Sequence, residues 1–252
     1  KQLNLAEEDY SYKQKNSGSL KYQYDEFNEE NDPYAEVEGF AIKDGLMTEN
    51  AKLWKPLAKL ASLMTLSDEE FSAKGDKELI NKESAIRLWL FLQIITGHDH
   101  TAKNVFYIAK YNDDLKHNYE FYFAPWDLDL TWGNVSVGEV NPYYTAYERD
   151  TIDNRVYWEV GDRLIDTDYN DSVAYMENLY TMLRKTVLTN GKVESMILEL
   201  DSELRNSGAF ARDKERWPEG IHADSCEELL SYAIGRLEFL DKALYNLESF
   251  VD

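Results

Sequence analysis

The residues best suited to chemistry gather in two short polar stretches, 97–104 and 125–129. The first contains Asp99 and, five residues later, Asn104, and the second contains Asp127. Carboxylate and amide oxygens are ligands that Mg²⁺ accepts, and a carboxylate can also orient and deprotonate a hydroxyl group. Phosphoryl transfer combines these two tasks. The residue types and their spacing therefore indicate a divalent-metal site that handles an anionic substrate.

A buried helix is predicted to lead into the first stretch. Residues 82–96 are apolar on nearly every side, which is typical of a helix at the centre of a domain. Asn81 is a suitable N-cap, because its side chain can accept a hydrogen bond from a free amide of the first turn. Gly97 is expected to end the helix in the left-handed conformation, which costs glycine little.

A β-hairpin is predicted to separate the two polar stretches. Strands are expected at Val105–Tyr111 and 120–124, with the polar turn 112–118 between them. The order helix, loop, hairpin, acidic loop would deliver the polar side chains to one end of the hairpin. The alternative is that Asp99 and Asn104 only cap a turn, which is a common role for these residue types.

The composition is that of a globular protein with a strongly acidic surface. Hydrophobic residues make up 43% of the 252, enough for a sizeable core. The formal net charge of −21 argues against nucleic acid or an anionic membrane as partner, because both are bound through clustered Lys and Arg. No apolar run approaches the length of a membrane-spanning helix, and Cys226 is the only cysteine, which excludes an intrachain disulfide.

Further helices are predicted in the second half of the chain, at 155–165, 171–189, 192–206 and 225–250. Segments 67–70 and 225–228 both have the Ser-x-x-Glu spacing of a capping box, which marks a helix start. The first fifty residues alternate poorly, and only 19–24 and 35–42 are expected there as short strands.

Both polar stretches resemble segments of the spore coat protein H (CotH) kinase family, and the resemblance covers roughly residues 17–248. Its most specific part is the Trp-Asp-Leu-Asp motif at 126–129, and further similar segments lie at 66–71, 163–166 and 216–218. The resemblance implies an atypical protein-kinase-like fold that transfers the γ-phosphate of ATP to Ser residues of protein substrates, with Mg²⁺ or Mn²⁺ as cofactor.

The resemblance also implies roles for individual residues. Asp99 would be the catalytic aspartate, and Asn104 and Asp127 would be metal ligands. Asp129, at a position where a conventional kinase has Gly, would belong to the same metal cluster. Lys103 could reach a transferred phosphoryl group, or it could be a loop lysine that faces solvent.

The expected fold class is α+β and predominantly helical, with a protein-kinase-like C-terminal lobe that carries the catalytic-loop hairpin. Residues 1–50 would be a remnant of the N-terminal lobe and a connecting segment, and residues 51–252 would form the helical lobe. The chain is expected to begin partway through the N-terminal lobe, near 17–21. Neither a glycine-rich phosphate loop nor a strand lysine is expected upstream of that segment.

A non-catalytic pseudokinase or scaffold domain is the main alternative function. Such a domain would keep the fold and bind a protein or a polysaccharide in a surface or extracellular complex, and the acidic charge favours it. The resemblance favours a spore coat, cell surface or secreted location over the cytoplasm. The sequence does not specify the oligomeric state.

Two other metal sites can be drawn from the sequence. His98 and His100 would share a face on an extended backbone, which with Asp99 suggests a zinc hydrolase. Segment 166–177 partly matches a calcium-binding loop, although Asp171 stands where that loop needs glycine. A helix N-cap at Asp168 or Asn170 is the favoured interpretation of this segment.

Overall fold

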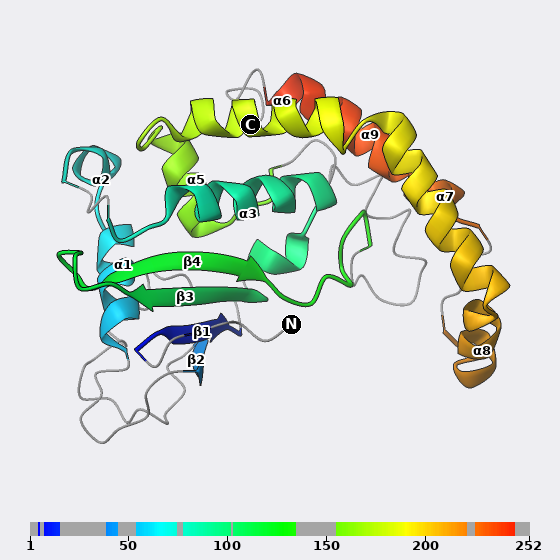
Figure 1. The fold of residues 1–252 in the computed structure, drawn as a ribbon, viewed down its shortest axis with the longest axis horizontal. Helices are drawn as coiled ribbons and strands as arrows, with labels where there is room; N and C mark the ends of the chain where they lie inside the picture. The colour runs from blue at the N-terminus through cyan, green and yellow to red at the C-terminus, as the bar shows by residue number, and fades with distance from the viewer. Residues whose placement is uncertain are drawn as a thin grey trace. The chain divides into compact units, whose positions relative to one another are not determined.

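Figure 1 shows the computed structural model of the protein. The described residues are 5, 8–15, 39–44, 54–74, 78–101, 103–134, 155–220 and 225–244. Their contacts divide the chain into two units. Unit 1 comprises 1–92, 98–128 and 156–176, and unit 2 comprises 93–97, 129–155 and 177–252. The predicted strand at 19–24 and the predicted boundary near residue 50 lie outside the described residues, so both stay predictions.

A small antiparallel sheet forms the centre of unit 1. Its strands are β1 (Tyr10–Gln14), β2 (Phe40–Asp44), β3 (Val105–Tyr111) and β4 (Tyr119–Pro125), in the order β2-β1-β3-β4. Figure 1 shows β1, coloured blue, beside the green hairpin of β3 and β4. The hairpin confirms the predicted strands, whereas β1 was not predicted.

The alternation of buried and exposed residues explains how the sheet packs. Tyr12, Tyr107 and Phe123 form one cross-strand row, because Tyr12 pairs with Tyr107 and Tyr107 with Phe123. All three are buried, and Tyr107 and Phe123 contact the indole of Trp158 at centroid distances of 6.4 and 5.0 Å. The face that carries this aromatic row is therefore the core face of the sheet.

The outer edge of β4 is closed by the segment that begins α3. The Phe121 amide donates to the Leu79 carbonyl at 2.8 Å, and the Asn81 amide donates to the Phe121 carbonyl at 3.0 Å. The Phe123 amide donates to Ser84 Oγ at 2.9 Å, and Pro125 has no amide hydrogen to offer. This edge is thereby protected against pairing with another strand.

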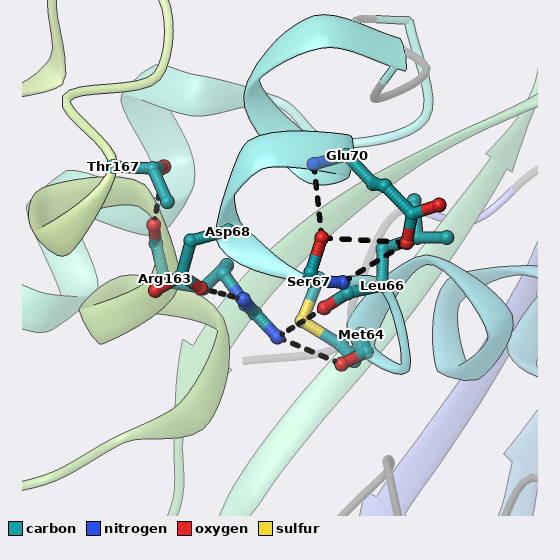
Figure 2. Close-up of polar contacts among 7 residues, drawn as sticks. All are labelled: Met64, Leu66, Ser67, Asp68, Glu70, Arg163 and Thr167. Atoms are coloured by element: carbon teal, nitrogen blue, oxygen red, sulfur yellow. Dashed lines mark hydrogen bonds and ion pairs between the residues drawn. The ribbon is translucent and has the colours of Figure 1, made fainter.

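Helices α1 (Lys55–Met64), α2 (Asp68–Lys74) and α3 (Lys82–Ile95) lie between β2 and the polar stretch that begins at residue 97. The predicted capping box is confirmed at α2, where Ser67 Oγ accepts from the Glu70 amide at 3.2 Å and the Ser67 amide donates to Glu70 Oε2 at 3.3 Å (Figure 2). The predicted N-cap of α3 is confirmed as well, since Asn81 Oδ1 accepts from the Ser84 amide at 2.8 Å.

The end of α3 differs from the prediction. Thr96, not Gly97, adopts the left-handed conformation, with φ of 51°. The Thr96 hydroxyl donates to the Ile95 carbonyl at 2.7 Å and accepts from Tyr232 Oη at 3.0 Å and the Gly133 amide at 3.2 Å. These hydrogen bonds within unit 2 offset the steric cost of a left-handed β-branched residue.

Helix α5 (Glu159–Asp166) packs on α3 around a buried carboxylate. Asp162 is 1% exposed; its Oδ1 accepts from Trp89 Nε1 at 3.2 Å, and its Oδ2 accepts from the Trp158 amide. Gly161 allows this close approach, because a Cβ there would lie 2.6 Å from Trp89 Cδ1 and 2.8 Å from Trp158 Cε3. The two tryptophans and the carboxylate thus fix α5 against α3.

Helices α6 (Ser172–Thr186), α7 (Asn190–Asn206), α8 (Ala209–Arg216) and α9 (Glu227–Ala243) make up most of the described part of unit 2, with the first turn of α6 in unit 1. α6 and α9 are joined through Arg184, whose Nη2 lies 2.8 Å from Asp241 Oδ2. Helix α8 was not predicted. The predicted capping box at Ser225 is wrong, because α9 starts later and Ser225 Oγ accepts from the Glu227 amide at 3.4 Å.

The described residues thus form a mixed α+β protein with eight α-helices and one small antiparallel sheet, which confirms the expected fold class at that level. None of the helices among these residues has the length and apolar character needed to cross a membrane.

Candidate functional site

The loop that follows α3 is a short 3₁₀ helix, η2 (His98–Thr101), which leads into β3. Asp99 lies in it with an 18% exposed side chain, and Asn104 follows at the start of β3 with 4% exposure. Asn104 Nδ2 donates to Asp99 Oδ2 at 2.7 Å. The two predicted site residues are therefore in direct contact, and the Asn104 amide oxygen is left available for a further partner.

Lys103 forms an ion pair with Asp99. Its Nζ lies 3.0 Å from Asp99 Oδ2, and its side chain is 43% exposed. The structure thus gives Lys103 a carboxylate partner, where the sequence left open a solvent-facing lysine. An exposed lysine keeps enough freedom to exchange this partner for a phosphate.

Asp127 is tied to the same loop through the backbone of its neighbour Trp126. The Trp126 amide donates to the Asn104 carbonyl at 2.8 Å, and the Trp126 carbonyl lies 2.9 Å from His100 Nε2. His100 is fully buried, so this contact is held from the interior of the protein. The exposed Asp127 side chain begins one residue beyond these anchors.

Both predicted metal ligands of unit 1 have a left-handed backbone. Asn104 has φ of 61° and Asp127 has φ of 59°. Asn and Asp adopt this conformation more readily than other side chains, and strained residues of this kind concentrate at functional sites. Asn118, in the hairpin turn, has the same φ of 61° with an exposed side chain.

Strand β1 brings a lysine to this end of the sheet. The Asn104 amide donates to the Gln14 carbonyl at 3.1 Å, and Lys13 pairs with Phe106. Lys13 Nζ lies 5.4 Å from the centroid of the Trp126 ring. The expectation of no strand lysine upstream of 17–21 is therefore wrong. The missed signal is the alternation Tyr-Ser-Tyr-Lys-Gln at 10–14, with tyrosines on one face.

Asp129 belongs to unit 2, so its membership in this cluster stays a prediction. Its side chain is exposed, and its carbonyl accepts from Asn134 Nδ2 at 2.9 Å. Within the described ranges, no three His, Cys, Asp or Glu side chains form a group suited to a metal ion. Mg²⁺ sites often use only one or two protein carboxylates and complete their ligand set with phosphates and water. Asn104 and Asp127 fit that kind of site.

The zinc site suggested for His98 and His100 is not supported by the structure. It required His98 and His100 on an extended backbone, whereas η2 is helical. His100 Nε2 is also engaged by the Trp126 carbonyl, so His100 has a structural role that sequence reasoning missed.

Segment 166–177 contains the start of α6 and not a calcium-binding loop. Asp168 Oδ1 accepts from the Val173 amide at 2.9 Å, inside the first turn of α6. At Asn170 it is the backbone carbonyl that forms a hydrogen bond, accepting from Lys82 Nζ at 2.6 Å. The Asp168 side chain thus accepts from an amide of the first turn, as the favoured interpretation requires, although the N-cap position itself is Asp171.

Two of the segments that carry the family resemblance meet around Arg163 (Figure 2). Its Nη2 donates to the carbonyls of Met64 at 2.9 Å and Leu66 at 3.0 Å, and its Nη1 pairs with the Asp68 carboxylate. The guanidinium also lies 5.4 Å from the Phe71 ring centroid. Arg163 thus joins α5 to the α1–α2 connection and has a structural role.

A comparison with known protein families shows which family the chain belongs to. The family described as CotH kinase protein matches residues 4–240, which is most of the chain. The chain belongs to the CotH kinase family. Membership in the CotH kinase family supports a kinase-like function. No curated protein matches the chain.

Proposed function

We propose that this CotH kinase family member transfers the γ-phosphoryl group of ATP to serine hydroxyls of a protein substrate in a reaction that requires Mg²⁺ or Mn²⁺. The observation that carries the proposal is the 2.7 Å hydrogen bond between Asn104 and Asp99, at the same end of the hairpin where Trp126 anchors Asp127. A proton acceptor and two oxygen ligands, held by one loop system, are what phosphoryl transfer requires.

Asp99 would accept the proton of the substrate hydroxyl. As the serine oxygen bonds to the γ-phosphorus, the bond from that phosphorus to the β–γ bridging oxygen breaks, and ADP leaves. The Asn104 amide would hold the Asp99 carboxylate toward the hydroxyl through its Nδ2. Lys103 would release Asp99 and contact the transferred phosphoryl group, which its 43% exposed side chain allows.

The metal would be held by the Asn104 side-chain oxygen and the Asp127 carboxylate, with Asp129 as a further proposed ligand. When bound, the metal neutralises negative charge on the phosphate oxygens. The left-handed backbone at Asn104 and Asp127 keeps these side chains in a fixed orientation before the nucleotide arrives. Trp126 and His100 maintain that orientation from the buried side.

A non-catalytic scaffold is the second candidate. The net charge of −21 favours it, because ATP is itself an anion and is repelled by an acidic surface. In this case Asp99 would remain paired with Lys103 and serve only to order the loop.

The test is phosphate transfer by the full-length protein, with ATP and Mg²⁺, to acidic and basic serine-containing proteins. We expect phosphoserine that forms only when the divalent metal is present and not after chelation. Calorimetry with Mg·ATP separates the candidates. Absence of heat at millimolar nucleotide, together with absence of phosphoserine, would favour the scaffold and contradict the kinase.

A further inference from the structure

We propose that a groove between α3 and β4 binds a segment of the protein substrate that lies close in sequence to the acceptor serine. The proposal rests on the kinase function proposed above and adds a class of substrate: a basic segment that carries one large apolar side chain. The two elements lie side by side within unit 1 (Figure 1).

α3 and β4 run in the same direction, and both lead to the candidate site. The Asn81 amide donates to the Phe121 carbonyl at 3.0 Å, and further along both elements the Phe123 amide donates to Ser84 Oγ at 2.9 Å. Later residues of the helix thus lie beside later residues of the strand. The helix is followed by η2, and the strand by Trp126. A ligand that lies between them is therefore directed toward the candidate site.

A groove of about 530 Å³ lies along these two elements. Phe91, Tyr122 and Pro125 are half-buried in its lining, so they offer apolar surface that a ligand can cover. Phe91 is four helical residues before the end of α3, and Asp99 follows four residues after that end. Phe91 therefore lies within about 20 Å of Asp99, a distance that about six residues of extended peptide span.

The charges of the groove favour a basic peptide over an anionic ligand. Arg87 is the single cation among the described lining residues. Its Nη2 lies 3.0 Å from Glu83 Oε2, and its Nε donates to Tyr175 Oη at 3.0 Å. The Glu83 side chain is 58% exposed, and the chain has a net charge of −21. This charge attracts a basic segment, whose Lys or Arg can bind the Glu83 carboxylate as well.

The backbone of β4 is not open to strand pairing beside the groove. The Phe121 amide is bonded to the Leu79 carbonyl, and the Phe123 amide to Ser84 Oγ. A peptide is therefore recognised through its side chains and not by adding a strand to the sheet. One large apolar side chain that covers the half-buried aromatic residues would supply most of the selectivity.

The experiment measures transfer from Mg·ATP to synthetic serine peptides by the full-length protein. Each peptide has a background of Ala, Gly and Lys and carries either leucine or alanine at one position, up to about six residues from the serine on either side. The variants are Phe91→Ala, Phe91→Leu and Phe239→Ala. Phe239 is the matched control, because it is also a half-buried phenylalanine of a helix but belongs to α9 and not to the groove.

We expect the wild type to have a KM about tenfold lower for the best leucine peptide than for its alanine counterpart, with kcat within about twofold. Phe91→Ala should lose this preference and keep the wild-type KM for the alanine peptide. Phe91→Leu should keep the preference to within about threefold, and Phe239→Ala should keep it in full. Glutamate in place of lysine in the best peptide should raise KM, and this difference should shrink at high salt.

Equal KM values for all leucine and alanine peptides with the wild type would overturn the inference while leaving the kinase function intact. A leucine preference that Phe91→Ala retains would overturn it as well, because another surface would then bind the leucine. Transfer to serine proteins but to none of the peptides would also contradict it. If the wild type formed no phosphoserine on any peptide or protein, the kinase function itself would fail, and the inference with it.

Discussion

The backbone amide of Trp126 donates to the carbonyl of Asn104 at 2.8 Å, which links the segment that follows β4 to the loop that precedes β3 across the end of the hairpin. Through this bond, the position of Asp127 depends on that of Asn104. Both residues are left-handed, so the loops are held in conformations that need neighbouring contacts to persist.

Asn104→Ala should raise the Mg²⁺ concentration needed for half-maximal ATP binding by about tenfold or more, because the variant lacks a proposed metal ligand. Asn118→Ala is the matched control, since Asn118 has the same φ of 61° in the hairpin turn. Both variants should lose about 1 kcal/mol of stability from the left-handed alanine. Metal titrations that give the same shift for both variants would contradict the ligand role.

Arg163→Met should reduce the free energy of unfolding by about 2–3 kcal/mol, because it leaves the Met64 and Leu66 carbonyls without their donor. Asp68→Ala should cost less than about 1 kcal/mol, since the Asp68 side chain is 74% exposed. Urea unfolding measures both values. Equal losses would mean that the exposed ion pair, not the carbonyl contacts, carries the effect.

Gly161→Ala should destabilise the protein by about 2–3 kcal/mol, because the added Cβ would lie 2.6 Å from Trp89 Cδ1. Gly191→Ala should instead stabilise it by about 0.5 kcal/mol, since Gly191 is in helix α7 with nothing within 4 Å of the new Cβ. Thermal unfolding of the two variants should shift the melting temperature in opposite directions. A gain for Gly161→Ala would contradict the close packing of α5 on α3.

Stability should fall steeply above pH about 10. Burial, and then the negative charge of Glu159, raises the pKa of the Tyr107 phenol far above the value near 10 expected for the unfolded chain. The folded protein therefore keeps a proton that the unfolded chain releases, so the contribution to stability is complete below pH about 10 and is lost as the pH rises beyond it. Urea midpoints measured from pH 8 to pH 12, with tyrosinate absorbance, follow this loss.

Tyr107→Phe is the control for the alkaline effect. It should be less stable at pH 8 by about 1 kcal/mol, because it loses hydrogen bonds to Trp158 and Gln14. Its stability should then decline less steeply above pH 10 than that of wild type. A decline of equal slope would show that Tyr107 does not contribute.

Local sequence signals predicted the elements next to the site but not their long-range partners. Helix α3 and the β3–β4 hairpin were predicted from periodicity and a polar turn, because these features act between near neighbours in sequence. Strand β1 was missed, since four of its five residues pair with β3 residues that lie 93 to 99 positions later, and no local signal specifies such a partner.

Long-range contacts also explain why some predictions next to the site were wrong. Gly97 is the better left-handed residue by local preference, yet Thr96 takes that conformation through hydrogen bonds to Gly133 and Tyr232. The contact between Asp99 and Asn104 agrees with the predicted spacing. His100 and Lys13 both contact Trp126, and the sequence does not reveal these contacts.

The most direct test of the central claim is to measure, on Asp99→Asn in the full-length protein, both Mg·ATP affinity and the single-turnover rate of phosphate transfer to serine. We predict an affinity within about twofold of wild type and a transfer rate lower by about 10²–10⁴-fold, the usual contribution of a general base. A transfer rate equal to that of wild type would contradict the role of Asp99.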